Sequence, residues 1–274
     1  MVTPHISSWD DLLYVSEEVD AETDTLKYTM FAAVNSEDTL YYGELPLRKA
    51  DIAFEQLTST LRPIPDADIY ADWPSGSAGT PALTLTSGAQ CKVATVFYIK
   101  RPGISLYDAF KRHGVAPLLG KTLLEEAHTM EFLSKHPHPN IIQYHGCLSQ
   151  RGFLTGIVFD CHSCGTLQDF LQQGLEGLDK QTFMDKLESA ILHLHSLGFA
   201  HNDLNPANVL VEEETKQPVL IDFGSARPVG EALGTSRGTS GWIEGKIQDY
   251  TTSRKENDLF ALRKMRAWIE EPTF

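Results

Sequence analysis

The chain has 274 residues, of which 42% are hydrophobic and 22% charged, values that are ordinary for a globular protein with a sizeable core. Its formal net charge of -14 argues against a nucleic-acid partner, because contact with phosphates requires clustered Lys and Arg. The N-terminus lacks a secretory signal, and no run reaches the ~18 apolar residues of a membrane span. We therefore expect an intracellular, cytoplasmic protein.

Residues 1–81 form the first predicted region, an acidic N-terminal extension that we expect to pack on the region that follows. Within it, residues 26–34 alternate partly between apolar and polar side chains and predict a strand. Residues 46–61 place apolar side chains at helical spacing and predict an amphipathic helix. Residues 62–81 are rich in Pro and Gly and predict a loop. An autoinhibitory or docking segment is the alternative for this region.

A strand and a helix follow the loop. Residues 93–100, V-A-T-V-F-Y-I-K, predict a strand that ends at Lys100. Residues 122–135 predict a helix, because Thr122 and Glu125 form the T-x-x-E pattern of a capping box.

One glutamate falls on the apolar face of this predicted helix. Glu126 shares that face with three apolar residues, Leu123, Met130 and Leu133. An unpaired buried carboxylate is costly, so Glu126 needs a cation, and Lys100 is the natural partner. Glu125 and Glu131 remain alternatives for this pair.

Two histidine- and cysteine-rich stretches invite a metal-site interpretation. The four cysteines stand at positions 91, 147, 161 and 164, and the last two form a C-x-x-C. A zinc site would need further ligands and the chain has no second C-x-x-C, so we expect free thiols. Prolines separate the histidines of residues 136–146, which predicts a turn and not a regular ligand face.

Three further elements complete the pattern around the central motif. Residues 153–159 predict a buried strand, followed by D-C-H-S-C-G and a helix after Thr166. Residues 182–197 predict a helix that Thr182 caps and Gly198 ends. Residues 253–270 predict a last helix.

The chemistry concentrates between residues 201 and 224, which read H-N-D-L-N-P-A-N-V-L, V-E-E-E-T-K-Q-P and V-L-I-D-F-G. Two short apolar runs predict a hairpin that holds Asp203, Asn208 and Asp222 on neighbouring loops. Such a set suits phosphoryl transfer. Asp203 can orient a hydroxyl and take its proton, and Asn208 and Asp222 can supply oxygen ligands to a metal ion.

These two loops, 19 residues apart from Asp203 to Asp222, resemble the protein-kinase catalytic loop H-R-D-L-x-x-x-x-N and the D-F-G motif. The resemblance implies an α+β, bilobal protein kinase-like fold, with a small β-rich N-lobe over residues 82–160. Residues 161–274 would form a helical C-lobe, truncated after the last predicted helix, which supports the catalytic loop in this family. A protein partner would cover this truncated C-lobe.

The resemblance also implies roles for individual residues. ATP and Mg2+ are the implied nucleotide and cofactor, and Lys100 would contact the phosphates while Glu126 orients it. Phe159 would occupy the gatekeeper position, and the hinge would follow it with Asp160, Cys161 and His162. His201 and Asp258 would support the catalytic loop, and residues 225–247 would form the activation segment.

The sequence departs from the kinase pattern at several positions. Asn202 replaces the arginine of H-R-D, and Asn205 replaces the lysine that follows the catalytic aspartate. The S-G-S-A-G-T stretch at residues 75–80 lacks the spacing of a glycine loop.

We therefore expect an ATP- and Mg-dependent transferase acting on a Ser/Thr hydroxyl. One alternative is a small-molecule kinase, since the loop is also similar to the H-G-D-L-H-P-G-N of aminoglycoside-phosphotransferase-type enzymes. Another is a pseudokinase acting as a binding module.

Overall fold

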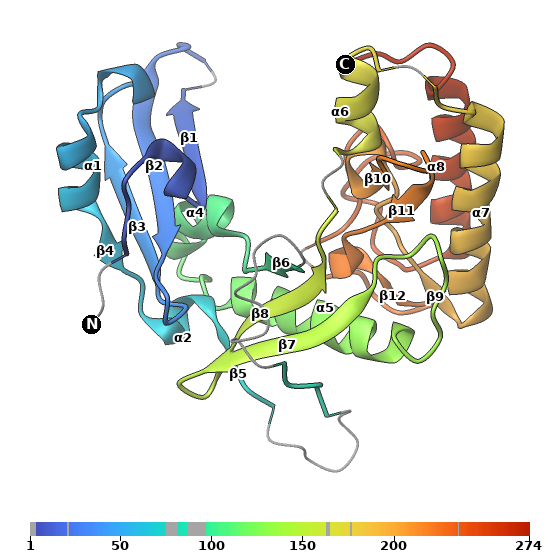
Figure 1. Cartoon of the computed structure of the whole chain (residues 1–274), viewed down its shortest axis with the longest axis horizontal. Helices are drawn as coiled ribbons and strands as arrows, with labels where there is room; N and C mark the ends of the chain where they lie inside the picture. The colour runs from blue at the N-terminus through green and yellow to red at the C-terminus, as the bar shows by residue number, and fades with distance from the viewer. Residues whose placement is uncertain are drawn as a thin grey trace. The chain divides into compact units, whose positions relative to one another are not determined.

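The computed structural model describes residues 4–20, 22–74, 82–86, 97–162, 165–175, 177–234 and 236–274 (Figure 1). The chain contains both helices and antiparallel sheets, which confirms the expected α+β class. The chain divides into two compact units. Unit 1 contains residues 1–75, 101–123 and 148–156, and unit 2 contains residues 76–100, 124–147 and 157–274. The predicted boundaries at residues 81 and 160 are a different division and stay a prediction.

The first unit contains a sheet in the order β1-β2-β3-β4. Its strands are β1 (Tyr14–Val19), β2 (Leu26–Val34), β3 (Leu40–Leu45) and β4 (Arg62–Pro63). Strand β2 has the predicted bounds. Its successive side chains point to opposite faces, and both faces are covered. Phe31 and Ala33 pack with Leu57 of helix α1 (Phe54–Thr60), whereas Ala32 packs with Tyr107 of helix α4 (Tyr107–Arg112).

The helix predicted over residues 46–61 is shorter than expected. A 3-10 turn, η2 (Lys49–Asp51), precedes α1, and the extended backbone of Ile52 and Ala53 separates the two. Gln56 explains the restart, because its side-chain oxygen accepts the Ala53 N–H at 3.0 Å. The remaining short elements of this unit are η1 (Trp9–Asp11), α2 (Asp66–Ile69), β5 (Ala71–Asp72) and η3 (Ile104–Leu106).

The second unit contains the strands that carry the site. Lys100 ends β6 (Phe97–Lys100), whose residues pair antiparallel with the end of β8 (Phe153–Asp160). The predicted hairpin is present as β10 (Val209–Val211) and β11 (Pro218–Leu220), with Val209 opposite Leu220. Strand β7 (Tyr144–Gln150) and β8 each have residues in both units, since residues 148–156 belong to unit 1, whereas β9 (Phe199–Ala200) and β12 (Arg227–Pro228) lie in the second unit and pair with each other.

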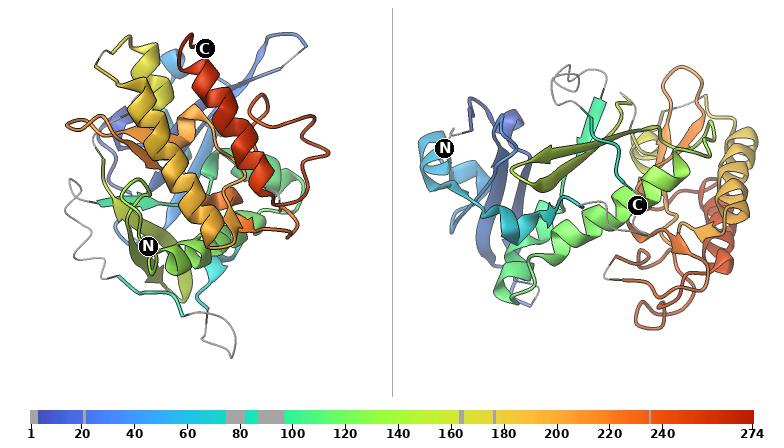
Figure 2. Two further views of the ribbon diagram at one scale, coloured as in Figure 1. Left: turned by 90° about the vertical axis from the view of Figure 1, so that its right-hand side faces the viewer. Right: turned by 90° about the horizontal axis from the view of Figure 1, so that it is seen from below.

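In the described part of the chain, three helices follow the predicted hinge residues, and α7 and α8 lie side by side (Figure 2). They are α6 (Leu167–Gln172), α7 (Lys180–Ser196) and α8 (Lys255–Trp268). Thr166 caps α6 as its sequence predicts. Helix α7 begins earlier than expected, because Asp179 and not Thr182 is the N-cap, and its side chain accepts the Thr182 N–H at 3.1 Å. Helix α8 begins at Lys255, so Ser253 lies outside the helix.

Helix α5 (Leu118–Leu133) begins four residues before the predicted start. Thr122 is therefore an internal residue, whose hydroxyl donates to the Leu118 carbonyl at 2.9 Å, and the capping box expected there is absent. Pro117 precedes the helix, and proline is favoured at such a start because its missing N–H is not needed there. The 3.6-residue periodicity is retained, and Leu123, Glu126 and Met130 are all buried.

Candidate active site

Lys100, Glu126 and Asp222 form an ion cluster in the second unit. The Lys100 Nζ lies 2.8 Å from Glu126 Oε1, 2.7 Å from Glu126 Oε2 and 2.9 Å from Asp222 Oδ1. The Glu126 side chain is only 2% exposed, whereas that of Asp222 is 46% exposed. The cluster thus joins a buried carboxylate to one that solvent or a ligand can reach.

The ionised state of this cluster follows from its composition. Burial lowers the pKa of Lys100, but the carboxylates of Glu126 and Asp222 outweigh this effect and raise the pKa above its usual value. Burial raises the pKa of Asp222, and Lys100 more than offsets that effect, so this pKa is lowered. A protonated amine therefore faces Glu126, whose pKa is raised by burial, and Asp222, whose exposed carboxylate retains its negative charge.

The three candidate glutamates of α5 have different partners. Glu126 is the partner of Lys100, and its Oε1 also accepts the Phe223 N–H at 3.2 Å. Glu125 forms an ion pair with Arg227. Glu131 accepts hydrogen bonds from Thr84 and from the Tyr144 hydroxyl. Of the alternatives left open by the sequence, only Glu126 contacts Lys100 in the structure.

Asp203 accepts hydrogen bonds from its own loop and from the predicted activation segment. The Thr239 hydroxyl donates to Asp203 Oδ1 at 2.7 Å, and Asn205 Nδ2 donates to the same oxygen at 3.1 Å. Burial raises the pKa of Asp203, although these two hydrogen bonds oppose the rise. Among the described residues, the hydrogen bonds to this carboxylate all reach Oδ1, so Oδ2 is the oxygen available to an acceptor hydroxyl.

Asn208 connects the two chemical loops. Its side-chain Nδ2 donates to the Asp203 backbone carbonyl at 2.8 Å, and the Asn208 backbone carbonyl accepts the Ile221 N–H at 3.0 Å. The latter contact places Asn208 beside the residue that precedes Asp222. Asp222 itself adopts a left-handed backbone with φ of 60°, and its Oδ1 accepts the Gly224 N–H at 3.2 Å. Asp tolerates this conformation because its short side chain can bond locally.

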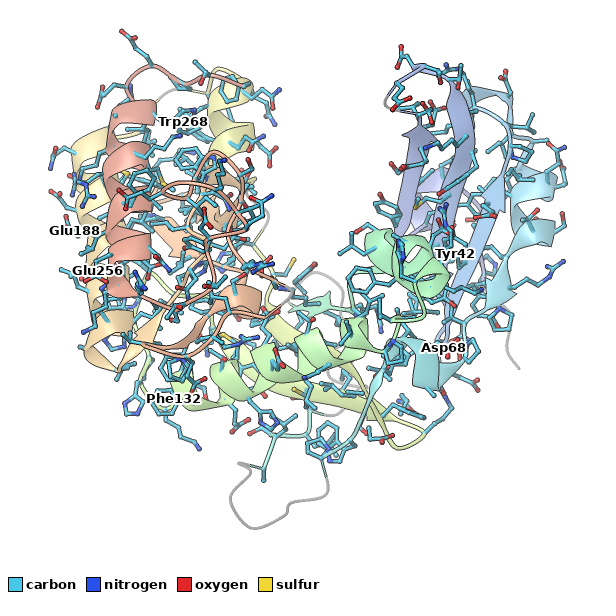
Figure 3. The ribbon with its side chains drawn as sticks, turned by 180° about the vertical axis from the view of Figure 1, so that it is seen from behind. Tyr42, Asp68, Phe132, Glu188, Glu256 and Trp268 are labelled. Atoms are coloured by element: carbon cyan, nitrogen blue, oxygen red, sulfur yellow. The ribbon has the colours of Figure 1, made fainter. Side chains whose placement is uncertain are left out.

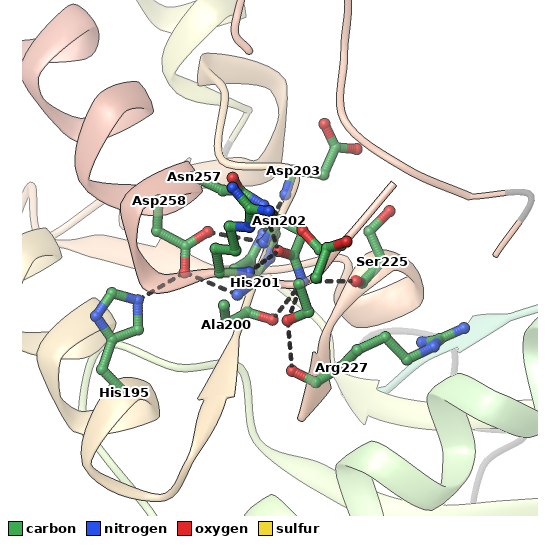
Figure 4. A network of polar contacts seen from close by, with 12 residues as sticks. His195, Ala200, His201, Asn202, Asp203, Ser225, Arg227, Asn257 and Asp258 are labelled. Carbon is green, nitrogen blue, oxygen red and sulfur yellow. Dashed lines mark hydrogen bonds and ion pairs between the residues drawn. The ribbon is translucent and has the colours of Figure 1, made fainter. Parts of the chain in front are cut away.

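A buried network around Asp258 supports the predicted catalytic loop (Figure 4). Asp258 of α8, which is fully buried, accepts the His201 N–H at 2.8 Å and the Asn202 N–H at 2.7 Å. His195 Nε2 donates to the same carboxylate at 2.8 Å. The His201 ring accepts the Asp203 N–H at Nδ1 and donates from Nε2 to the Ile221 carbonyl. The support roles expected of His201 and Asp258 thus match these contacts.

Asn202 is a hub that the sequence did not predict. Its Nδ2 donates to two carbonyls and one hydroxyl, those of Ala200, Ser225 and Ser253, at 2.9 to 3.1 Å. Its Oδ1 accepts from Asn257 Nδ2 at 3.0 Å. The sequence showed only that the expected arginine was absent. It did not indicate the contacts of Asn202, because its partners lie up to 55 residues away.

A pocket of about 290 Å³ lies beside the ion cluster, within the second unit. The predicted hinge residues Phe159, Asp160, Cys161 and His162 all line it. The other lining residues are Tyr98, Lys100, Glu126, Ile142, Leu210, Ile221 and Asp222. The pocket therefore joins a mostly apolar wall to the charged cluster.

The glycine-rich stretch and the four cysteines are only partly within the described residues. Residues 75–80, with the glycine-rich stretch, lie outside the described residues, as do Cys91 and Cys164. Cys161 is free and exposed, and Cys147 is free and buried. Among the residues that the structure describes, no group of three His, Cys, Asp or Glu side chains could hold a metal ion.

A magnesium ion would find suitable donors at Asn208 and Asp222. The Asn208 amide uses its Nδ2 for the Asp203 carbonyl, which leaves its oxygen as the free end of the amide among the described contacts. Asp222 offers a second carboxylate oxygen besides the one that binds Lys100. Carboxylate and amide oxygens are hard ligands of the kind Mg2+ prefers, so the donor set fits.

Comparison with known proteins defines the class. The family model described as "Protein kinase domain" matches residues 85–266. The chain therefore belongs to the protein kinase domain family, which confirms both the resemblance of its motifs and the kinase-like fold. The match includes every proposed site residue of the second unit.

Individual relatives are similar over shorter stretches. The chain is 30% identical over 122 residues to the mitogen-activated protein kinase kinase kinase mom-4 of Caenorhabditis elegans, covering 43% of this chain and 22% of that protein. It is 30% identical over 130 residues to the serine/threonine-protein kinase PKH3 of Eremothecium gossypii, covering 47% and 18%. It is 34% identical over 98 residues to the serine/threonine-protein kinase/endoribonuclease IRE1 of Oryza sativa subsp. japonica, covering 33% and 11%.

These matches therefore span less than a quarter of each relative. A separate finding concerns membranes. In the described ranges, none of the helices has the length and apolar character needed to cross a bilayer.

Proposed function

We propose that this chain transfers the γ-phosphoryl group of ATP, with Mg2+, to a serine or threonine hydroxyl. The observation that carries the proposal is the ion cluster in which Lys100 contacts Glu126 and Asp222 at 2.7 to 2.9 Å. The nucleotide requires a fixed cation for its phosphates, and the metal requires an exposed carboxylate nearby. The cluster supplies both at the edge of a pocket with an apolar wall.

Each site residue has a defined task in this proposal. Lys100 binds the phosphates, and the buried Glu126 fixes the position of its ammonium group. Asn208 and Asp222 hold Mg2+, which neutralises charge on the phosphates when bound. Phe159, Asp160, Cys161 and His162 border the adenine end of the pocket.

Asp203 orients the acceptor hydroxyl and receives its proton as the new P–O bond forms and the bond to ADP breaks. The free Oδ2 serves this purpose, because Oδ1 is occupied by Thr239 and Asn205. The names of the relatives, which are serine/threonine-protein kinases, support a protein hydroxyl as acceptor. A small-molecule hydroxyl could use the same carboxylate, so an acceptor screen separates the two.

A second candidate is a nucleotide-binding module without transfer. Asn205 favours it, because this neutral residue stands where the kinase loop has lysine and so removes one positive charge from the transferring phosphoryl group. Asn205 is buried and bonded to Asp203 and Thr239, so its contacts order the loop without supplying charge.

The test is the Asp203→Asn variant. We expect phosphoryl transfer to fall by at least about a hundredfold, since general-base help contributes on that order, while nucleotide affinity changes little. Radiolabel transfer from ATP measures the first and thermal shift with MgATP the second. Equal transfer by wild type and variant would remove Asp203 from the mechanism, and a wild type that binds nucleotide without transfer would favour the binding module.

A further inference from the structure

Arg227 is a charged residue beside the D-F-G turn that the mechanism above does not use. Its guanidinium forms an ion pair with Glu125 of α5 and donates from Nη1 to the carbonyls of Gly224, at 3.2 Å, and Ala226, at 2.7 Å. The Arg227 side chain is 13% exposed and that of Glu125 is 37% exposed. Arg227 therefore holds the turn and the helix at the same time.

The backbone of Arg227 is fixed independently of this ion pair. In strand β12 it pairs with Ala200 of β9, the strand that leads into the catalytic loop. Its carbonyl also accepts the Ser253 hydroxyl at 3.0 Å. The guanidinium thus extends toward α5 from a backbone that is held by hydrogen bonds.

Adjacent glutamates of α5 contact opposite ends of the D-F-G turn. Glu126 accepts the Phe223 N–H, at the start of the turn, and binds Lys100. Glu125 binds Arg227, at its end. Neighbouring positions on a helix point in directions about 100° apart, so the two contacts together restrict rotation of α5 about its axis.

We propose that Arg227 is a positioning residue that holds α5 against the D-F-G turn, so that Glu126 stays within reach of Lys100. This inference rests on the proposed function, because the Lys100–Glu126 pair belongs to that site. Arg227 contacts neither a substrate nor a reacting atom. Its effect on the reaction passes through the orientation of Glu126.

The planar guanidinium suits this task better than an ammonium group. It offers separate nitrogens in a fixed fork, one to the turn carbonyls and one to the Glu125 carboxylate. Lysine would keep the charge but not the fork. We therefore expect Arg227→Lys to give an intermediate result between wild type and Arg227→Gln.

Hydrogen exchange tests the proposal without requiring nucleotide or activity. We expect Arg227→Gln and Glu125→Gln to increase amide exchange in residues 124–133 and 222–227. The double variant should show no further increase over Arg227→Gln, because that substitution already removes the contact with Glu125. Exchange that is unchanged in both segments in both single variants would overturn the proposal.

A second readout follows the site itself. Each variant should raise the KM for ATP by up to about fivefold, the range for a partly exposed ion pair, and retain the wild-type KM for the acceptor. A nucleotide-binding wild type whose KM for ATP is unchanged in both variants would also overturn the proposal. A wild type that binds no nucleotide contradicts the proposed function, and hydrogen exchange still decides the role of Arg227 in holding α5.

The matched control is Arg266→Gln. Arg266 of α8 pairs with Asp185 and with Glu188, a partly exposed residue of α7 (Figure 3). The substitution removes a comparable ion pair but lies away from the D-F-G turn. We expect no change in exchange over residues 124–133 and no change in the KM for ATP. An equal effect in this control would mean that Arg227 acts through general stability, which overturns the positioning role.

Discussion

Asn202, an uncharged residue, anchors the predicted catalytic loop through the hydrogen bonds of its side chain. Its side chain is 1% exposed, its φ is +64°, and its amide bonds link the catalytic loop to residues after the D-F-G turn and to α8. Asparagine tolerates this left-handed conformation better than most residues. The side chain of Asn202 thus makes neutral hydrogen bonds, so a phosphate on the predicted activation segment would find no arginine at this position.

The Asn202→Ala variant measures the contribution of this hub. We expect the free energy of unfolding to fall by about 1–3 kcal/mol, because buried carbonyls lose their donor and alanine disfavours positive φ. Urea denaturation checks the value. Asn202→Gly is the matched variant, since glycine removes the same hydrogen bonds without backbone strain. A loss below about 0.5 kcal/mol in both variants, the level of an ordinary surface substitution, would contradict the account.

The main site residues were predictable because short motifs fix their chemistry. Asp203, Asn208 and Asp222 stand at defined spacings, and the requirement of a buried carboxylate for a cation singled out Glu126 and Lys100. The contacts of Thr239, Arg227 and Asn202 were not predictable. Their partners are 36, 102 and 55 residues away along the chain, and no local pattern reports such pairing.

At the scale of elements, helix positions were predicted better than helix starts. The apolar stripes of α5 and α7 indicated both helices, but each begins before the expected capping residue, at Leu118 and Lys180. Threonine followed by an acidic residue also occurs inside helices, where its hydroxyl bonds to the preceding turn, as Thr122 does. The pattern is therefore ambiguous when an earlier proline or aspartate can begin the helix.

Asp179 provides a pH-dependent test at the start of α7. Hydrogen bonds from the Thr182 side chain and N–H lower the pKa of Asp179 below its usual 3.8. A lowered folded-state pKa means that the stabilisation is complete above 3.8 and is lost as the pH falls through the folded-state value. We expect Asp179→Ala to melt below wild type at pH 7, with the difference shrinking below pH 3.8.

Thermal melts by circular dichroism over this pH range make the comparison. Asp249→Asn, a change at an exposed carboxylate, serves as control for the loss of one negative charge. A difference for Asp179→Ala that stays constant down to pH 2 would assign the effect to helix propensity and not to the cap.

At the scale of the whole molecule, the family match and the site fall on the same part of the chain. The match covers residues 85–266, and all the residues of the ion cluster and of the pocket belong to the second unit. The β1–β4 sheet of the first unit lies before the matched residues. Of its strands only β2 was predicted, because the burial of β1 and β3 does not alternate from residue to residue and neither strand shows the period-two pattern.

The most direct test of the central claim is the melting temperature with and without MgATP, for wild type and for Asp222→Asn. At a nucleotide concentration a hundred times the dissociation constant, binding should stabilise the wild type by about 2.7 kcal/mol. The account predicts a magnesium-dependent rise in wild type that Asp222→Asn loses and that the control Asp185→Asn retains. No rise in a wild type that melts cooperatively, or an equal rise in Asp222→Asn, would contradict a nucleotide site built on Lys100, Glu126 and Asp222.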